Sequence, residues 1–566
     1  MEPRGEVFVL GLILSVIVLI ISVMISVWAR RLTRNLGDYY VAGRSIGAIN
    51  NGLAMVSLAL SLTTFIGLTA LIIEGLYIAV AVYASFTAAF IGLMVLAAPY
   101  LRRHKSFTTM AFISERYDSK TLRYISVIVM MIVSVLYLAG NLKGIGIVFF
   151  FLLGVPEVVG IVVGGLVVTL YVTLGGMYGV TYNQTFQTIV LLFCLMFPVA
   201  IVMRTLGASG WAFPPLGYGD MVPQMTEAVP HYFWAMVAHP VVYIAVFLGS
   251  FFGIIGLPHF VMRYFTVRDA KEARWSTVIC VFLVGLVNTT VYATGFAAVY
   301  YMQAQGVDIS SAAYDYVVLI LVEALAGDSW LALAVAGSVA AGLSTVSGLL
   351  MIMGAGLIHD LYGTIRPDVD DEKKLKLSYG AMFFVGIAVI IFSLEPPEFI
   401  LEAIMWSFGI AAAGLGVPIV LGIWWKRTNK YGVGAGMVVG TLIAFVSWIM
   451  IGYMGMDPVD IPFPFFANYF YGPLGWIKVI AVAVPVSFIL TIVVSWLTPP
   501  PSEELQRQVD EMHGWNDVDP KRYNSKVLPV VIIILSIFIM YFMTYEPEGT
   551  DFPRLEGQEH TLRDRD

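Results

Sequence analysis

The chain has 566 residues, of which 59% are hydrophobic and 12% are charged, and its formal net charge is −6. A soluble protein of this size could not bury that much apolar surface and still cover itself with polar groups. The composition therefore predicts a multi-span membrane protein, and the lack of a basic patch argues against a nucleic-acid partner. Two cysteines, Cys194 and Cys280, are too few for a disulfide framework or a zinc site.

Fourteen apolar segments are long enough to be candidate spans, because a helix needs roughly 20 apolar residues to cross a membrane. They are apolar all round and lack the alternation of barrel strands, so helices are predicted. In chain order they are 6–28, 47–73, 76–99, 124–150, 158–178, 185–205, 237–262, 275–302, 331–357, 377–395, 399–424, 432–454, 474–497 and 527–545. A long polar stretch precedes the last segment, which leaves 13 or 14 spans open.

Lysine and arginine predict the orientation of these spans. Most of the 32 basic residues fall in alternate loops, at 30–44, 102–123, 263–274, 366–376, 426–430 and 507–526. The positive-inside rule places these loops in the cytoplasm, so the N-terminus is predicted outside a cell membrane, which we expect to be a prokaryotic plasma membrane. Arg30 and Arg31 follow the first segment where a signal peptide would have a small-residue cleavage site, so that segment is predicted to stay as a span.

Two spans have sequences that predict an interruption. The second contains Ser57–Thr64, rich in hydroxyls, and the seventh contains Gly249–Pro258. Glycine and proline are tolerated at membrane depth where the freed backbone lines a protein cavity. The two interruptions lie five spans apart, and this odd offset inverts the second unit relative to the first. Paired broken helices in inverted halves indicate the binding site of a secondary transporter.

The ninth span carries an oxygen-rich face. Ala341, Ser344 and Thr345 are spaced so that they share one side of a helix. Two hydroxyls and a loosened carbonyl could supply part of the oxygen shell that a hard cation such as Na⁺ requires. The alternative is that both hydroxyls bond back to carbonyls of the preceding turn, as is common in membrane helices.

Several motifs follow one another in a recognisable order between about Gly37 and Gly440. They are Asp38–Arg44, Gly175–Met177 with Tyr182 and Gln187, Gly256–Val267, Ala341–Asp360, and Trp425–Asn429 with Gly432 and Gly436. In this order and spacing the chain resembles the sodium:solute symporter family, and within it the acetate and short-chain monocarboxylate permeases. The resemblance implies an all-α membrane protein with the five-plus-five inverted repeat of the LeuT type, formed by spans two to six and seven to eleven.

The same resemblance implies a domain plan and a cation site. We expect an N-terminal extra span and loop at 1–45, the transport core at 46–424, accessory spans at 425–497, a cytoplasmic linker or short helix at 498–526, a last span at 527–545 and a polar tail at 546–566. Sodium would be bound by the backbone carbonyls of Ser57, Leu60 and Ala341 and the hydroxyls of Ser344 and Thr345. Gln184 stands where many members have an Asp linked to a second cation route, which puts a second sodium site in doubt.

Candidate solute residues lie beside the two breaks. Thr63, Thr64 and Gly253 could bind a carboxylate through hydroxyls and half-helix ends. Lys143, inside the fourth span, could attract such a group, or could instead reach the outer headgroups or pair with Glu402. Aromatic residues make up 13% of the chain, as an interfacial belt requires, so none is singled out as a solute ligand.

Three further residues are predicted at a gate or exit route. His259 and Arg263 lie one turn apart at the cytoplasmic end of the seventh span, and Gln184 joins them by its place in the motif. The alternative for the pair is a helix-end cation cluster that faces the lipid surface.

The sequence thus predicts a secondary transporter that carries Na⁺ with a small organic solute, most simply a short-chain monocarboxylate such as acetate or propionate. Its partners would be Na⁺, the solute and membrane lipid, with no other cofactor. The alternatives are a sodium symporter for proline, a sugar, a vitamin or a nucleobase, or a transporter-fold sensor. A membrane enzyme predicts clustered His, Asp and Glu at membrane depth, whereas the 7 histidines are scattered. The oligomeric state is not indicated.

Overall fold

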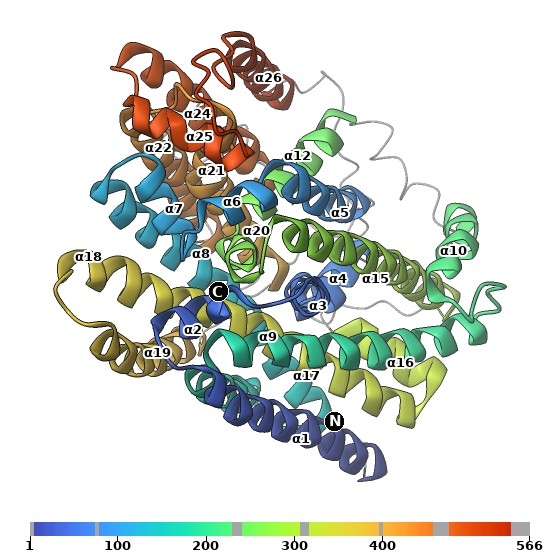
Figure 1. Cartoon of the computed structure of the whole chain (residues 1–566). Helices are drawn as coiled ribbons and strands as arrows, with labels where there is room; N and C mark the ends of the chain where they lie inside the picture. Colours follow the sequence, from blue (N-terminus) through green and yellow to red (C-terminus); the bar gives the residue numbers. More distant parts are fainter. Residues whose placement is uncertain are drawn as a thin grey trace.

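The computed structural model describes residues 5–73, 79–228, 240–305, 316–394, 400–454, 456 and 475–544. Within these ranges every regular element is a helix, and one isolated bridge joins Ile46 to Val267. Each of the fourteen predicted segments contains helix in the described residues. The helices pack side by side into one bundle (Figure 1).

Before and within the first half of the core the elements are α1 (Gly5–Ala29), η1 (Arg30–Leu32), α2 (Leu36–Val41), η2 (Ala42–Arg44), α3 (Ala48–Ala59), η3 (Thr63–Gly67), α4 (Leu68–Ile73), α5 (Ala79–Leu96), α6 (Ala98–His104), α7 (Thr109–Arg116), α8 (Lys120–Leu153), α9 (Glu157–Thr205) and α10 (Pro214–Ala228). In the second half they are α12 (Pro240–Gly256), α13 (Pro258–Val261), α14 (Arg263–Thr266), α15 (Ala270–Gln305), α16 (Val317–Ala326), α17 (Asp328–Ala355), η6 (Gly356–Tyr362), α18 (Gly363–Ile365), α19 (Asp371–Phe392), α20 (Ile400–Ala411), η7 (Ala412–Gly416) and α21 (Val417–Trp424). The flanking elements are α22 (Lys430–Ser447), η8 (Trp448–Tyr453), α24 (Gly475–Leu497), α25 (Glu503–His513) and α26 (Val527–Thr544).

By length and composition, 9 helices in the described part can cross a membrane, or up to 11 if each bent pair counts as one span. The fourteen predicted segments exceed this number for identifiable reasons. Helix α9 counts once although it holds two predicted spans, α12 has only 17 residues, and the apolar part of α26 is Val527–Met540.

Helix α9 folds back on itself at Gly176. That residue has φ 55° and ψ −155°, a conformation that favours glycine, and a Cβ there would lie 2.7 Å from the Tyr39 ring. On either side of it, the Tyr171 hydroxyl and the Gln184 amide donate to the neighbouring carbonyls of Leu343 and Ser344, both at 2.8 Å. On a straight helix Tyr171 and Gln184 would be about 20 Å apart, so the bend separates two spans as predicted.

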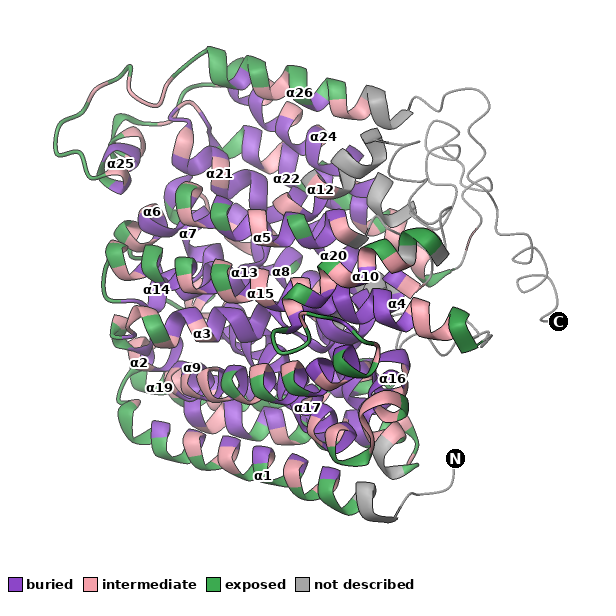
Figure 2. Ribbon diagram, turned by 90° about the vertical axis from the view of Figure 1, so that its right-hand side faces the viewer, coloured by how far each residue is buried: buried purple, intermediate pink, exposed green. Residues whose placement is uncertain are grey.

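The predicted cytoplasmic loops all lie at one end of the bundle. Figure 2 shows α2, α6, α7 and α25 at one end and α10 and α16 at the opposite end. Hydrogen bonds tie these basic loops together: Arg102 Nε donates to Val267 O at 2.6 Å, and Arg103 Nη1 donates to Met512 O at 3.1 Å. The alternation of loops read from the charges is therefore confirmed.

Side-chain caps begin several helices at this basic end. A side-chain oxygen accepts from a backbone N–H of the first turn at Asn35, Thr108, Ser119, Asp370, Asn429 and Ser502. The first N–H groups of a helix have no partner within the helix, so these caps stabilise the six starts. Each fixes the point at which a polar loop enters the apolar bundle.

Two helices lie between the predicted spans at the end of the bundle opposite the basic loops. Helix α10 packs on α15, and α16 packs on α9 and α17. Both are too short to be recognised as spans. Helix α10 also has Pro223 in its interior and several glycines, which read as loop signals.

The second interruption is shorter than predicted. Helix α12 continues through Gly249 and Gly253 and ends at Gly256, before the extended residue Leu257. A Cβ on Gly249 would lie 2.8 Å from Ile480, and one on Gly253 would lie 2.7 Å from Phe408. Close helix packing explains these two glycines, and only the Gly256–Pro258 part breaks the helix.

Candidate sodium and solute site

The break in the first broken helix leaves the carbonyls at the end of α3 without helical hydrogen-bond donors. Leu60 leaves helical geometry with φ −94° and ψ 57°, so the last carbonyls of α3 have no helical N–H to accept from. Side-chain hydroxyls replace those donors. Ser344 donates to Ser57 O at 2.8 Å, Thr345 approaches Leu58 O at 3.5 Å, and Thr64 donates to Ala59 O at 2.6 Å. Two of these three hydroxyls come from the oxygen-rich face of α17.

Three oxygens converge around a single hydroxyl hydrogen at Ser344. Its Oγ lies 2.8 Å from both Ser57 O and Ala341 O, yet a serine hydroxyl has one proton to donate. The back-bond to the preceding turn and the contact with the broken helix therefore occur together. Ser57, Ser344 and Thr345 are fully buried, and all these oxygens are neutral. A small hard cation suits this set of oxygens, because it binds neutral oxygens and could interact with the carbonyl to which the single Ser344 proton is not donated.

Leu60, the remaining predicted ligand, lies at the break itself. Its N–H donates to Val56 O at 2.8 Å, which closes the last turn of α3. Its carbonyl belongs to a residue with non-helical dihedrals, so it is not committed to a helical hydrogen bond. The cation role of the five predicted residues remains a prediction that fits this geometry.

Gln184 connects the Ser344 site to Arg263. Its Nε2 donates to Ser344 O at 2.8 Å and to Ser347 Oγ at 3.3 Å, while its Oε1 accepts from Arg263 Nη2. A Cβ on Gly348 would lie 3.1 Å from that Nε2, so the glycine leaves room for the amide. Arg263 also donates to Thr181 Oγ1 at 2.9 Å. One amide thus bridges the α17 face and the segment that follows the second break.

His259 and Arg263 are both buried, each with 2% exposure. The alternative that this pair faces the lipid surface is therefore wrong, because α8 and α9 cover the two side chains. The His259 ring lies 5.2 Å from the Tyr137 ring of α8. Within the described residues, all the hydrogen-bond partners of the Arg263 side chain are neutral.

A cluster of aromatic and hydroxyl side chains fills the junction of the two breaks. The Tyr137 hydroxyl interacts with Ser61, two residues after the end of α3, and its ring stacks on Phe408 of α20 at 5.9 Å. Tyr83 of α5 donates to Thr64 O at 2.7 Å. These residues are all at most 3% exposed. We call Ser61, Thr64, Tyr83, Tyr137, His259 and Phe408 the junction cluster.

The predicted solute residues are distributed unequally around this cluster. Thr64 belongs to it, and Thr63 lies in η3 with its side chain outside the described residues. Gly253 packs on Phe408, one residue of the cluster, from inside α12. Lys143 is half-buried in α8, and the side chain of Glu402, its predicted alternative partner, lies outside the described residues. The solute roles of these four residues stay predictions.

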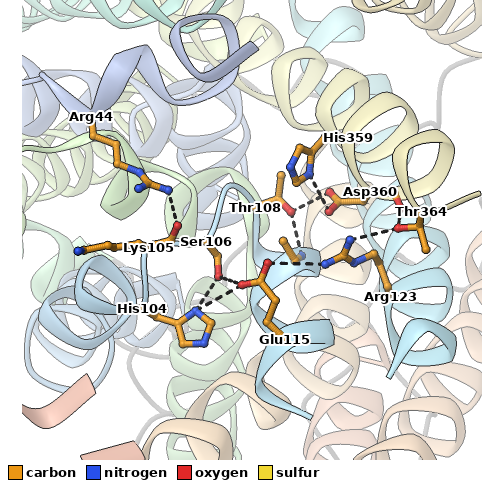
Figure 3. A network of polar contacts seen from close by, with 11 residues as sticks. Arg44, His104, Lys105, Ser106, Thr108, Glu115, Arg123, His359, Asp360 and Thr364 are labelled. Carbon is orange, nitrogen blue, oxygen red and sulfur yellow. Dashed lines mark hydrogen bonds and ion pairs between the residues drawn. The ribbon is translucent and has the colours of Figure 1, made fainter. Parts of the chain in front are cut away.

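At the basic end, a polar network holds the exit of α17 against α7 and α8 (Figure 3). Asp360, fully buried in η6, accepts from Thr108 Oγ1 at 2.7 Å and lies 3.2 Å from His359 Nδ1. Arg123 donates to Thr364 Oγ1 at 3.1 Å and lies 3.7 Å from a Glu115 oxygen. The end of the helix that carries Ser344 is thereby fixed to the first repeat.

Solved structures share this fold. A Na⁺-coupled sialic acid symporter, in a substrate-bound outward-open state, matches with a TM-score of 0.68 at 17% identity, over 87% of this chain and 99% of that one. MhsT, in complex with L-phenylalanine, matches with a TM-score of 0.50 at 12% identity, over 88% of this chain and 99% of that one. The architecture is therefore the LeuT-type inverted repeat of secondary transporters, as predicted.

A sequence model of the sodium:solute symporter family matches residues 39–440. The chain belongs to the sodium:solute symporter family. Sodium-coupled transport of a solute across a membrane is the function that this class and fold define, and the protein is a multi-pass membrane protein.

Sequence reasoning missed part of the site. Ser61, Tyr83 and Tyr137 were not singled out, although Ser61 lies inside the predicted break. Tyr83 and Tyr137 look like any other aromatic residue of a membrane helix, and no periodicity separates a buried hydroxyl from an interfacial one.

Proposed function

We propose that this protein is a symporter that couples the entry of a short-chain monocarboxylate, such as acetate or propionate, to that of Na⁺. The observation that carries the coupling is the convergence of Ser57 O, Ala341 O and Ser344 Oγ between the first broken helix and α17. The choice of solute is supported by the resemblance of the motifs, Gly256–Val267 among them, to those of acetate and short-chain monocarboxylate permeases. The buried cationic side chain of Arg263 in that segment also supports it.

In the proposed mechanism, Na⁺ bridges the end of α3 and the Ser344 face of α17. The ion binds Ser57 O, Leu60 O, Ala341 O and the two hydroxyls, and so holds the broken helix in the shape that completes the junction cluster. The solute binds in that cluster. Each ligand raises the affinity of the protein for the other ligand. The factor by which Na⁺ raises the affinity for the solute equals the factor by which the solute raises the affinity for Na⁺.

The proposed orientation sets the direction of transport. The basic loops face the cytoplasm, and the N-terminal end of α1 faces outward. A negative interior potential then draws Na⁺ inward with about 2.3 kcal/mol per charge for each 100 mV. The network around Asp360 closes the cytoplasmic side while the ion and the solute bind from outside.

Competition in proteoliposomes tests the choice of solute. Uptake of radiolabelled acetate is measured with Na⁺ outside and with excess unlabelled acetate, propionate, pyruvate, proline or glucose. We expect acetate and propionate to inhibit fully and proline and glucose to leave uptake unchanged. Sodium-driven uptake of proline or glucose, with no uptake of acetate, would assign the protein to another solute.

A further inference from the structure

His259 is a buried side chain whose polar atoms have no hydrogen-bond partner among the described residues. Its residue exposure is 2%, and neither Nδ1 nor Nε2 forms a hydrogen bond in the described structure. A neutral imidazole carries one N–H donor and one acceptor nitrogen, and burying both unpaired is costly. Native proteins almost always satisfy such groups, so a partner from outside the chain is expected there.

The surroundings of His259 are suited to a small polar ligand. The ring packs against Tyr137 at 5.2 Å and Phe260 at 4.6 Å, and Tyr137 in turn stacks on Phe408. The Tyr137 hydroxyl interacts with Ser61 at the first break. Aromatic walls with a few polar groups are typical of small-molecule sites. The imidazole and the phenol belong to different repeats, so a ligand held by both would bridge the two breaks.

The charge around this position favours an anion. Arg263 follows His259 by one turn and is 2% exposed, and none of its hydrogen-bond partners in the described chain is a carboxylate. Through Gln184, the guanidinium is linked to the carbonyl of Ser344, beside the proposed sodium position. The buried positive charge of Arg263 attracts a negative ligand, because the local dielectric is low.

We infer that His259 donates a hydrogen bond to the carboxylate of the transported solute, with the Tyr137 hydroxyl as a second donor and Arg263 as the balancing charge. The inference rests on the proposed function and adds to it the residue that selects a carboxylate over a neutral group of the same shape. His259 is thus a specificity-determining residue of the solute site. It is placed there by the second break rather than at a gate.

The experiment compares acetate with acetamide, which has nearly the same shape without the charge. Full-length variants His259→Leu and His259→Gln are reconstituted, and the concentration of each compound that half-inhibits Na⁺-driven uptake of radiolabelled propionate is measured. We expect His259→Leu to raise the half-inhibitory concentration of acetate by about tenfold or more, because a hydrogen bond to a charged group is lost. The half-inhibitory concentration of acetamide should change little. His259→Gln keeps a donor, so its acetate value should stay within a few-fold of wild type.

Val261→Ala is the matched control, since Val261 lies on the same short helix as His259, is fully buried and has no polar group. It should leave the acetate-to-acetamide ratio unchanged. Equal weakening of both compounds in His259→Leu, or an unchanged acetate value, would overturn the inference and assign His259 to packing or to a bound water. The affinity for Na⁺ in the absence of solute, measured by calorimetry, should be the same in wild type and His259→Leu.

The failure of the proposed function gives a different result. In that case the wild-type protein shows no Na⁺-driven uptake of acetate or propionate. If wild type transports both compounds and the His259 variants do the same with an unchanged preference for acetate over acetamide, the symporter stands. The role of His259 alone is then refuted.

Discussion

Replacement of Ser344 by alanine removes the hydroxyl at the centre of the proposed sodium site. That oxygen contacts Ser57 O on the broken helix and Ala341 O on its own helix, both at 2.8 Å. The variant keeps both carbonyls and the helix, because alanine is the best helix former. Its effect should therefore be confined to the ion and to the contact between α3 and α17.

The expected magnitude follows from the loss of one neutral oxygen ligand of a buried cation. An interaction of this kind with a charged group contributes about 1.5–3 kcal/mol, which is about 10- to 150-fold in affinity. The Na⁺ concentration for half-maximal uptake should rise by this factor. Thr345→Val should act in the same direction, with a smaller effect, because its hydroxyl is 3.5 Å from Leu58 O.

The assay is uptake into proteoliposomes as a function of external Na⁺ at fixed solute. Ser338→Ala is the matched control: Ser338 lies on the same helix, is fully buried, and donates only to Ala334 O of its own helix at 2.8 Å. A wild-type sodium dependence in Ser344→Ala would refute the reasoning. An equal shift in Ser338→Ala would also refute it, because helix disruption would then explain both.

Three further predictions concern the surrounding network and the cytoplasmic helix. Gln184→Leu should raise the half-maximal Na⁺ concentration several-fold in the same uptake assay, because Ser344 O loses its 2.8 Å donor; an unchanged value would separate Gln184 from the ion site. Lys426→Met should release α25, measured as faster hydrogen exchange there, because it leaves Asp510 buried without its 2.7 Å partner at a cost of about 3–5 kcal/mol; wild-type protection would contradict this. Burial lowers the pKa of His513 from 6.5, so the folded state resists protonation, and the docking of α25 should weaken as pH falls below about 6.5. His513→Phe, which keeps an aromatic ring but cannot titrate, should abolish this pH dependence of the protection of α25 from exchange. A pH dependence that persists would assign it to another group.

Sequence patterns predicted the parts of the site that depend on local geometry. The shared face of Ala341, Ser344 and Thr345 follows from helix spacing, and the break after Ser57 follows from its run of small and hydroxyl residues. The docking of Thr345 against Leu58 O could not be predicted, because it depends on how two segments distant in sequence meet.

Burial was the property that the sequence reading estimated least well. His259 and Arg263 look like interfacial cations at a helix end, since their position relative to α8 and α9 is a tertiary property. Gly253 looks like part of a break, yet it fits the ring of Phe408 against α12. A glycine in a membrane helix has the same sequence appearance in both roles, and only the packed neighbour distinguishes them.

The most direct test of the account is solute accumulation in proteoliposomes that contain the purified wild-type protein. Radiolabelled acetate is followed with an inward Na⁺ gradient, with equal Na⁺ on both sides, and with an inward proton gradient in the absence of Na⁺. The account predicts accumulation above the external concentration only with the Na⁺ gradient. Accumulation driven by protons alone, or uptake that is the same with and without the Na⁺ gradient, would contradict it.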